Sequence, residues 1–421
     1  MNWPRRVFLG PIEIAGYYSG LARGLEQLGV ETVQLDLGGH SFAYRAARPP
    51  KGIARLVASC ASRRVSTRRR AGRGFWRGLQ AVLTVPLFVR LVVTCDLFVF
   101  GYASSLFRLR ELSLLRLLRR RIVFVFHGSD SRAPYLDGSE MATERGISVA
   151  ECIALTRKRK ARLRHIERYA DAVIANPLSA HLHERPIVPF VHVGIPALAT
   201  PPSDSQPRRP GPVQLLHAPS HPAAKGSDEI RAAVERLRAA GVELELIEVR
   251  AQPNDVVLGL LQACDAVVDQ VYADTPMAGF SAEAAAYSKP AIIGGYAWHE
   301  LLGDDLPPTH RCAPDELDAA IERIALDEGY RRELGARAHE FVSTVWAARE
   351  VARRLLEAAS GEGPRFDPSS LRYCHGAGFR EAEARRLIGD VLALEGPAAL
   401  QVADKPELER ALVAFGERAE E

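Results

Sequence analysis

Residues 124–132, FVFHGSDSR, place His127 and Asp130 directly after a fully apolar run, where their side chains could do chemistry. A histidine at the carboxyl end of a strand can donate a hydrogen bond to a sugar hydroxyl, a carbonyl or a phosphate oxygen. Asp130 could fix the tautomer of that histidine or hold a nearby hydroxyl. The alternative is that His127 only completes a turn.

Two further segments each place a helix amino terminus beside a residue that could bind a phosphate-bearing ligand. In residues 217–229, HAPSHPAAKGSDE, Lys225 stands two or three residues before the expected start of a helix. In residues 278–293, AGFSAEAAAYSKPAII, a helix begins with small residues and carries one acid, Glu283. Helix amino termini and lysines attract phosphate, so together the segments predict a diphosphate site. The alternative is that the first segment is only a solvated turn and that the second is only a helix cap with a solvated acid.

A fourth segment, GPIEIAGYYSG at residues 10–20, joins an apolar run to a helical one and is rich in glycine. Its glycines would let the backbone pass close to a ligand, and the helix that follows favours negative charge. The segment lacks both the G-x-G-x-x-G fingerprint and the P-loop GK[ST], which argues against a dinucleotide or P-loop site. The alternative is a tight turn that binds no ligand.

The elements that must position these segments alternate between strand-like and helical character. Short apolar runs are separated by amphipathic stretches, the pattern of parallel sheets with helices on both faces. The Pro-rich residues 195–212 interrupt the alternation, which then resumes, so the sequence predicts two α/β domains joined by a linker. The expected strands lie at residues 5–10, 31–37, 95–100, 121–126, 171–175, 213–219, 243–249, 265–271 and 290–295.

Length and composition favour a two-domain cytoplasmic protein. The 421 residues are long for one core, and the six scattered cysteines form no C-x-x-C pair, which favours reduced thiols over a disulfide framework or a zinc site. The apolar stretch before Pro11 is too short for a signal peptide. The longest apolar run, residues 81–93, is interrupted by Pro86 and Arg90 and is shorter than the roughly 20 residues of a spanning helix, so we expect no membrane crossing.

The net charge of +4 conceals an asymmetry between the two halves of the chain. Residues 1–200 contain 31 Lys and Arg against 14 Asp and Glu, a net of +17, whereas residues 201–421 contain 24 against 37, a net of −13. Such a basic half attracts phosphate-bearing substrates, an anionic membrane or the acidic half of the same molecule.

Seven arginines are concentrated between residues 63 and 77, ahead of an aromatic and apolar continuation to residue 93. Residues 63–93 are either an interfacial element that docks on anionic lipid or a solvated loop followed by a core-facing helix. Because no helix-turn-helix, RNP or zinc pattern accompanies the charge, nucleic-acid binding is not expected.

In their order along the chain, these segments resemble the retaining glycosyltransferases of the GT-B fold, group 1 or family 4. Gly16 to Gly29 matches the glycine-rich first loop and helix of that family, and residues 126–132 match its F-H-G-S-D-x-R segment. Lys225-Gly226 matches its K-G pair, and residues 279–292 match its G-F-x-x-E-A…K-P-x-I segment. The resemblance covers most of residues 1–360, and the motifs are specific together although each one alone is common.

The resemblance implies an α/β chain with the GT-B fold, in which two Rossmann-like, doubly wound domains face a cleft. The second domain would bind the nucleotide-sugar donor, UDP- or GDP-linked, and the first would hold the acceptor, without a metal ion or a further cofactor. With the linker and an appended helical segment read from the residue pattern, the predicted limits are 1–195 for the acceptor-side domain, 196–212 for the linker, 213–346 for the donor-binding domain, 347–360 for a helix that crosses back, and 361–421 for an appended helical extension.

Residue by residue, the resemblance implies that Glu283 binds the ribose hydroxyls and that Lys225 stabilises the leaving diphosphate. It also implies that His127 lies near the transferred sugar, with Asp130 beside it. The remaining expected site residues are Gly279, Phe280, Ser281, Ser220, His221, Asp274 and Thr275 for the donor, and Gly16, Tyr17 and Ser19 in the first loop.

The sequence departs from the family pattern at two points. An acid is common eight positions before the ribose glutamate, where this chain has Thr275, with Asp274 beside it. An arginine is frequent three or five positions before the phosphate lysine, where this chain has Pro222 and Ser220. Loss of a bidentate arginine weakens a diphosphate clamp unless another basic residue replaces it.

The sequence therefore predicts a metal-independent hexosyltransferase-type enzyme that moves a sugar with retention from a nucleotide-sugar donor. The acceptor would be a hydroxyl of a saccharide, a lipid-linked sugar or a small molecule, and the enzyme would be cytoplasmic or peripheral at the inner face of the cell membrane. The departures leave open a degenerate GT-B protein that binds a nucleotide or a protein partner without transfer. A third, less favoured alternative is a GT-B enzyme that epimerises a sugar nucleotide without any acceptor.

Overall fold

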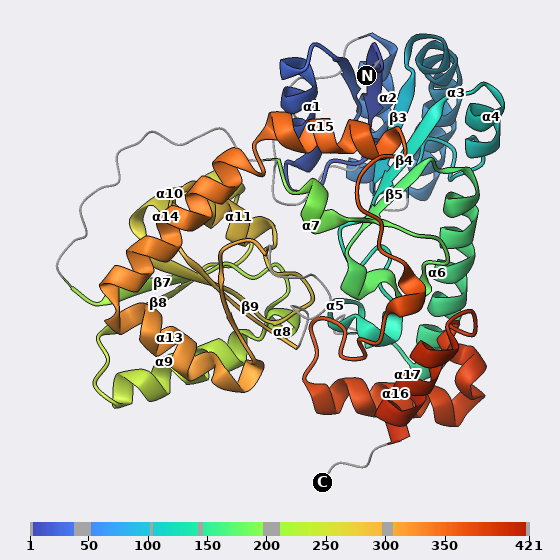
Figure 1. Cartoon of the computed structure of the whole chain (residues 1–421). Helices are drawn as coiled ribbons and strands as arrows, with labels where there is room; N and C mark the ends of the chain where they lie inside the picture. Colours follow the sequence, from blue (N-terminus) through green and yellow to red (C-terminus); the bar gives the residue numbers. More distant parts are fainter. Residues whose placement is uncertain are drawn as a thin grey trace.

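Two parallel sheets organise the chain (Figure 1). The structure, a computed structural model, describes residues 3–37, 52–101, 104–141, 146–196, 211–296 and 306–417. The first sheet has six strands in the order β2-β1-β3-β4-β5-β6, and the second has five in the order β11-β10-β9-β7-β8. The predicted class, two doubly wound α/β domains, is confirmed.

Every expected strand is present, and the central ones are buried on both faces. β3 and β4 have almost wholly apolar sequences because helices cover both sides of a parallel sheet. Two strands were not expected, β6 and β11, which lie at sheet edges and are only two and three residues long. The strands are β1 Arg6–Leu9, β2 Glu31–Gln34, β3 Leu97–Gly101, β4 Arg121–Val125, β5 Ala172–Ala175, β6 Val188–Pro189, β7 Val213–His217, β8 Leu244–Glu248, β9 Ala266–Ala273, β10 Ala291–Gly295 and β11 His310–Cys312.

The helices flank these sheets, and most follow the expected amphipathic stretches. In the first domain they are α1 Tyr17–Gln27, α2 Ile53–Ser66, α3 Arg70–Thr94, α4 Leu112–Leu117, α5 Gly138–Met141, α6 Val149–Tyr169 and α7 Phe190–Val193. In the second they are α8 Pro222–Lys225, α9 Ser227–Ala239, α10 Asn254–Ala263, α11 Gly279–Ala286, α13 Leu317–Leu326 and α14 Glu328–Thr344. Short 3₁₀ turns are η1 Pro134–Leu136, η2 Pro177–Leu182, η3 Pro314–Glu316, η4 Pro368–Ser370 and η5 Pro397–Leu400. Most of the expected linker, at 197–210, lies outside the described residues.

Helix α15, Ala348–Ala359, returns from the second domain and packs on α1 of the first (Figure 1). The two helices touch at Gly24, where a Cβ atom would lie 1.9 Å from the carbonyl oxygen of Ala348. Trp346, just before α15, is buried, and its ring nitrogen donates to the carbonyl oxygen of Val191 at 3.2 Å. These contacts fix the point at which the chain crosses between the domains.

The appended carboxy-terminal segment is helical, as the sequence analysis expected, except for one stretch that precedes its helices. Residues 371–379 are not helical, and the α-helices in the described part of this segment are α16, Glu381–Glu395, and α17, Pro406–Glu417. Gly376 and Gly378 have positive φ angles of 72° and 79°, which L side chains rarely adopt and which interrupt a helix. At Gly376 a Cβ atom would also meet the carbonyl oxygen of Leu136 at 2.3 Å.

This extended stretch contacts both domains, and α16 packs on α6 of the first. The backbone N–H of Gly138 in the first domain donates to the carbonyl of Ala377 at 2.8 Å. The next residue, Gly378, donates to the carbonyl of Tyr272 in the second domain, also at 2.8 Å. We call residues 371–380 the strap, because they are hydrogen-bonded to both domains at once.

Candidate functional site

Two hollows meet at the edge where the carboxyl ends of the two sheets face each other. The first is lined by His127 and the first loop on one side and by residues around Thr275 on the other. The second is lined mainly by the second domain and includes Lys225. Each encloses about 240 Å³, and their shared walls are Ala15, Ala278, Gly279 and Glu283. They are therefore two halves of one cleft, at the edge where open α/β sheets bind ligands.

His127 lies at the carboxyl end of β4 and forms part of the floor of the first hollow. Its ring contacts Tyr17 edge-on, with centroids 4.9 Å apart, and Phe190 at 5.5 Å. Burial lowers the pKa of His127 to about 4, so the imidazole is neutral at physiological pH. Within the described residues its buried Nε2 has no hydrogen-bond partner, which leaves this atom able to bond to a ligand hydroxyl.

Asp130 does not orient the His127 ring, contrary to one of the roles considered from the sequence. One carboxylate oxygen, Oδ1, accepts the backbone N–H groups of His127 and Gly128, each at 2.9 Å. Burial raises the pKa of Asp130 to about 6. Its role in this structure is to hold the turn that carries His127.

Replacing His127 with glutamine should reduce the acid sensitivity of the protein. The native histidine stays neutral down to about pH 4, whereas a histidine in the unfolded chain binds a proton below about pH 6.5. Between these values acidification favours unfolding. We expect wild type to lose about 2 kcal/mol more unfolding free energy than His127→Gln between pH 7 and pH 5, in urea titrations. Asp130 acts in the opposite direction in both proteins, so equal losses would contradict this assignment.

The first loop is held by a buried carboxylate, Glu13, that the sequence analysis did not single out. Glu13 accepts the backbone N–H groups of Tyr18 and Ser19 at 3.0 Å and the Ser19 hydroxyl at 2.6 Å. Ser19 therefore supports the loop and does not line the cleft, whereas Gly16 and Tyr17 do line it. The sequence feature that could have indicated this role is the presence of one acid, Glu13, within the glycine-rich loop.

Lys225 reaches the floor of the second hollow and is paired there. Its ammonium group lies 3.0 Å from Asp269 Oδ1 and 2.8 Å from Gln270 Oε1 on β9. The second carboxylate oxygen of Asp269 accepts the Ser281 hydroxyl at 2.5 Å. Burial alone would raise the pKa of Asp269, but Lys225 and Ser281 more than offset it, and the pKa is lowered. Ser281 thus contributes its hydroxyl to this chain of contacts and not to the cleft wall.

The amino terminus of α11 opens directly onto the cleft. Ala278, its first flanking residue, is extended and provides no side-chain cap, and the first N–H groups of a helix have no intrahelical partner. Gly279 and Phe280 line the second hollow at this point. Glu283, in the second turn of α11, is buried and accepts a hydrogen bond from Asn254 Nδ2 at 3.4 Å. Asn254 begins α10 and was not predicted; no local spacing links it to Glu283.

Three other residues predicted to bind the nucleotide-sugar donor do not all lie in the same hollow. Ser220 lines the second hollow, but His221 is exposed and lines neither. Thr275 lines the first hollow, where its hydroxyl donates to the carbonyl of Met277 at 3.3 Å. Among the described residues, no group of three or more His, Cys, Asp or Glu side chains is arranged to hold a metal ion.

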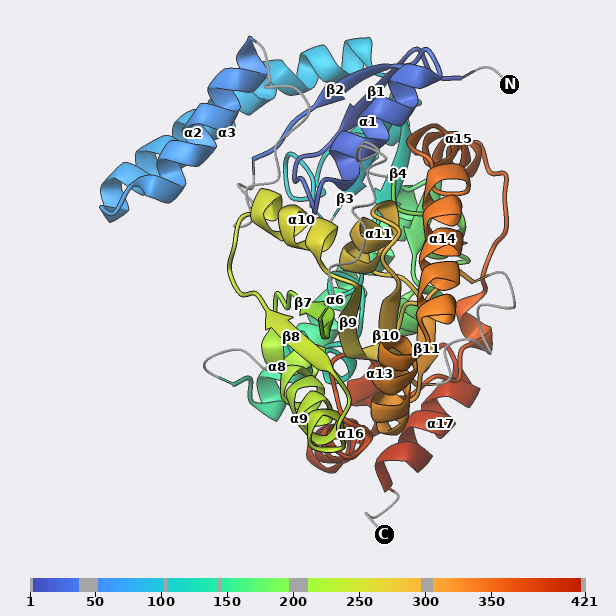
Figure 2. The same cartoon turned by 90° about the vertical axis from the view of Figure 1, so that its left-hand side faces the viewer.

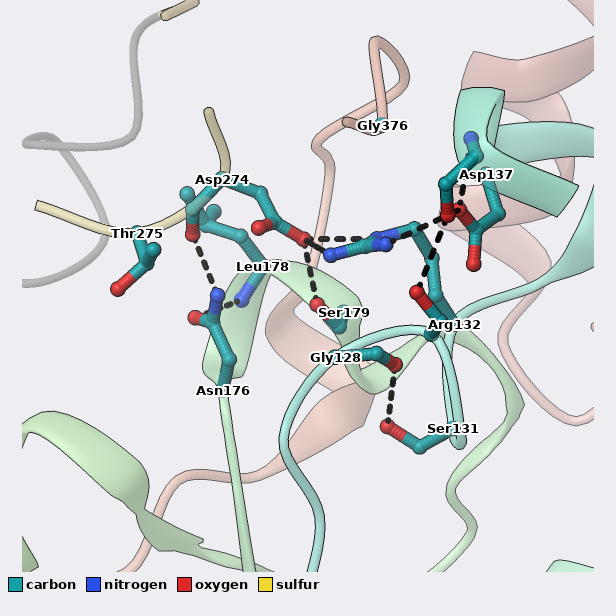
Figure 3. Close-up of polar contacts among 12 residues, drawn as sticks. Gly128, Ser131, Arg132, Asp137, Asn176, Leu178, Ser179, Asp274, Thr275 and Gly376 are labelled. Atoms are coloured by element: carbon teal, nitrogen blue, oxygen red, sulfur yellow. Dashed lines mark hydrogen bonds and ion pairs between the residues drawn. The ribbon is translucent and has the colours of Figure 1, made fainter. Parts of the chain in front are cut away.

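Asp274 is bonded to the first domain across the cleft (Figure 3). Arg132 donates to Asp274 Oδ2 from Nε at 2.8 Å and from a terminal nitrogen at 2.6 Å, and the Ser179 hydroxyl donates to the same oxygen at 2.6 Å. Asn176 donates to the Asp274 backbone carbonyl. We call Arg132, Asn176, Ser179 and Asp274 the interdomain clamp. The acid beside the expected sugar-recognition position, Thr275, is therefore already bonded to other residues of this chain.

Known proteins resemble this chain in their three-dimensional structure and not detectably in their sequence. No protein-family model matches the sequence, and no curated protein matches it. The structure is similar to sucrose-phosphate synthase from Thermosynechococcus elongatus, with a TM-score of 0.50 and 15% identity over 85% of this chain and 98% of that one. It is also similar to Anabaena HepE in complex with UDP-glucose, with a TM-score of 0.47 and 13% identity over 85% and 100% of the two chains. The two parallel-sheet domains of this chain, facing each other across a cleft, form the GT-B fold.

Proposed function

We propose that this protein is a glycosyltransferase that moves a sugar from a nucleotide-sugar donor to an acceptor hydroxyl with retention. The observation that carries the proposal is the second hollow, where Lys225, the open amino terminus of α11 and Glu283 meet. A cation and a helix amino terminus suit a diphosphate, and a buried carboxylate suits a pair of ribose hydroxyls. The GT-B fold and the family resemblance of the motifs support the same class.

The two halves of the cleft suggest how the substrates divide between them. The diphosphate would lie against Lys225 and α11, with the base and ribose beyond Glu283. The transferred sugar would then point through the shared wall at Gly279 toward His127. A neutral imidazole with a free nitrogen can hold a sugar hydroxyl there, and apolar rings of Tyr17 and Phe190 exclude water around it.

The remaining features of the proposal are the donor, the acceptor and the location. The donor carries UDP or GDP, and the acceptor is a saccharide, a lipid-linked sugar or a small molecule. Retention and metal independence come from the family resemblance. All six cysteines are free and buried, which suits a reducing, cytoplasmic location.

One observation favours a second candidate, a GT-B protein that binds a nucleotide but transfers no sugar. Asp274, beside the position where the family carries an acid, is bonded to Arg132 and Ser179 of its own chain. Such a protein would keep the nucleotide half of the cleft and lack a partner for the donor sugar.

Donor binding and turnover separate these candidates. Thermal shift against UDP, GDP and their sugar conjugates should identify one nucleotide that raises the melting temperature, because a ligand of the native state stabilises it. Incubation of that donor with candidate acceptors should yield a glycoside of unchanged anomeric configuration. Nucleotide binding without transfer or donor hydrolysis across the panel would favour the non-catalytic candidate, and conversion of donor to an epimer without acceptor would favour an epimerase.

Glu283→Ala should weaken nucleotide binding by about 10- to 100-fold, the loss expected when a charged hydrogen-bond acceptor is removed. Isothermal titration with the nucleotide measures this directly. Glu322→Ala removes an exposed acid from α13 of the same domain and should leave the affinity unchanged. If the two variants bind the nucleotide equally well, Glu283 is not the ribose ligand.

A further inference from the structure

Helices α2 and α3 form a hairpin that projects away from both domains (Figure 2). The sequence analysis expected no spanning helix because Pro86 and Arg90 interrupt the apolar run, but α3 continues through both and is 25 residues long. By length and composition alone, α3 could be a membrane-spanning helix or the core helix of a soluble domain. Only 22% of its most apolar window is buried against the protein, which argues against a core helix. A core helix of the same composition would bury most of that window.

The exposed apolar side chains of α3 form one continuous face. At about 100° per residue they fall within about 100° of arc, and over 18 residues they extend about 27 Å along the helix. We call these residues the apolar stripe: Phe75 is 63% exposed, Val82 68%, Val85 52%, Val89 57% and Val93 72%. The described part of the chain leaves this whole face without a covering element.

The opposite face of α3 is already covered, by α2 and by the core of the first domain. Thr84, Leu87, Phe88 and Leu91 are buried there, as are Val57 and Cys60 of α2. If α3 crossed a bilayer, α2 and its arginines would have to enter the hydrocarbon with it, at a cost of about 2.5–3.5 kcal/mol for each central arginine. A helix with one apolar and one packed or charged face instead lies in the plane of the interface.

The charge of the hairpin identifies the kind of surface it fits. Residues 53–94 contain nine arginines and no aspartate or glutamate. Arg68, Arg69 and Arg70 are exposed at the turn between the helices, next to Phe75 at the start of the apolar stripe. A second copy of this chain would bring nine more arginines against these, and a nucleic acid would leave the stripe uncovered. An anionic lipid surface satisfies both features.

We infer that the α2–α3 hairpin docks the protein on an anionic phospholipid bilayer, with the apolar stripe in the interface and the arginines at the headgroups. The inference goes beyond the proposed function and does not depend on sugar transfer, because lipid binding is measured without donor or acceptor. If transfer is also found, docking at a membrane would favour a lipid-linked acceptor and an enzyme at the inner face of the cell membrane.

The test is flotation of the full-length protein with vesicles of phosphatidylcholine alone or with 30% phosphatidylglycerol, at about 0.05 M and 0.5 M salt. We expect binding to the anionic vesicles at low salt and much less at high salt. Replacing Arg68, Arg69 and Arg70 with glutamine should lower the partition coefficient about 100-fold, at about 1 kcal/mol per arginine near the surface. Val82→Asn with Val89→Asn should lower it by at least about 10-fold, because two side chains leave the interface.

Matched controls keep this test decisive. Arg332, Arg337 and Arg349 are exposed in the last third of the chain, and their replacement by glutamine changes the net charge equally. Leu326, 65% exposed on α13, is the control for the stripe when replaced by asparagine. Both controls should bind vesicles as wild type does, and unchanged melting temperatures would establish that the variants fold. The inference would be overturned if the wild type did not bind anionic vesicles at low salt, or if variants and controls lost binding equally. It would also be overturned if the protein formed a dimer without vesicles and the stripe variant abolished that dimer.

Discussion

Lys225→Ala should lower kcat/KM for sugar transfer by about 10²- to 10³-fold, the effect of removing one preorganised group that stabilises developing charge. The leaving diphosphate gains negative charge as the bond to the sugar breaks. Among the described residues that line the second hollow, Lys225 is the one cation, and Asp269 and Gln270 hold it at 3.0 and 2.8 Å. This pairing keeps the ammonium in place before the donor arrives.

The same pairing means that Lys225→Ala has a structural consequence as well. Asp269 is buried, and without Lys225 its charge is compensated only by Ser281 and more distant groups. The melting temperature must therefore be measured beside the kinetics, and Lys225→Arg, which keeps the charge, should recover part of both. Lys158→Ala removes an exposed lysine of α6 and should leave kcat/KM and stability unchanged. A Lys225→Ala enzyme that transfers sugar at the control rate would exclude Lys225 from the reaction.

The sequence predicted which segments reach the cleft because each site segment follows an apolar strand. In parallel sheets the carboxyl ends of strands meet at one edge, so His127 after β4 and Lys225 after β7 were expected to lie near that edge. The glycine-rich start of α11 marked a helix terminus for the same reason. Strand periodicity and turn chemistry are local properties, and local properties can be read from one sequence.

Which hydrogen bonds the side chains of these segments make could not be predicted in the same way. Asp130 and Ser19 have side chains that suit catalysis, and both are used to hold loops. Which oxygen accepts which N–H depends on turn geometry to within a fraction of an ångström, and the same residue types would serve either use. The sequence therefore indicated which loops lie at the cleft, and the structure adds that Asp130 and Ser19 bond to groups of their own loops.

Contacts between distant segments carried no sequence signal at all. Arg132 and Asp274 are separated by 142 positions, and the strap joins two domains through backbone groups of Ala377 and Gly378. Backbone bonds place no demand on side-chain type beyond the glycines that permit the positive φ. The helical composition around them gave the wrong prediction for residues 371–379.

Asp274→Ala should destabilise the protein by about 3–5 kcal/mol, the cost of leaving a buried charge without its partner. Arg132 and Asp274 have side chains only 8% and 6% exposed, and the guanidinium donates twice to one carboxylate oxygen. Burial disfavours the charge on Arg132, but Asp274 and Asp137 raise its pKa above the ordinary value. Removal of Asp274 leaves Arg132 with Asp137 at 3.4 Å as its remaining acidic contact. Urea titration of the full-length protein measures the change.

The matched control is an exposed pair of the same chemistry. Arg236 donates to both oxygens of Asp318 at 2.7 Å, with side chains 60% and 39% exposed. Asp318→Ala should cost at most about 1 kcal/mol, because water replaces an exposed ion pair. Because Asp274 joins the domains, its loss should also increase the radius of gyration in X-ray scattering, whereas Asp318→Ala should not change it. If Asp274→Ala is no less stable than Asp318→Ala and scatters as wild type does, the interdomain clamp does not hold the two domains together.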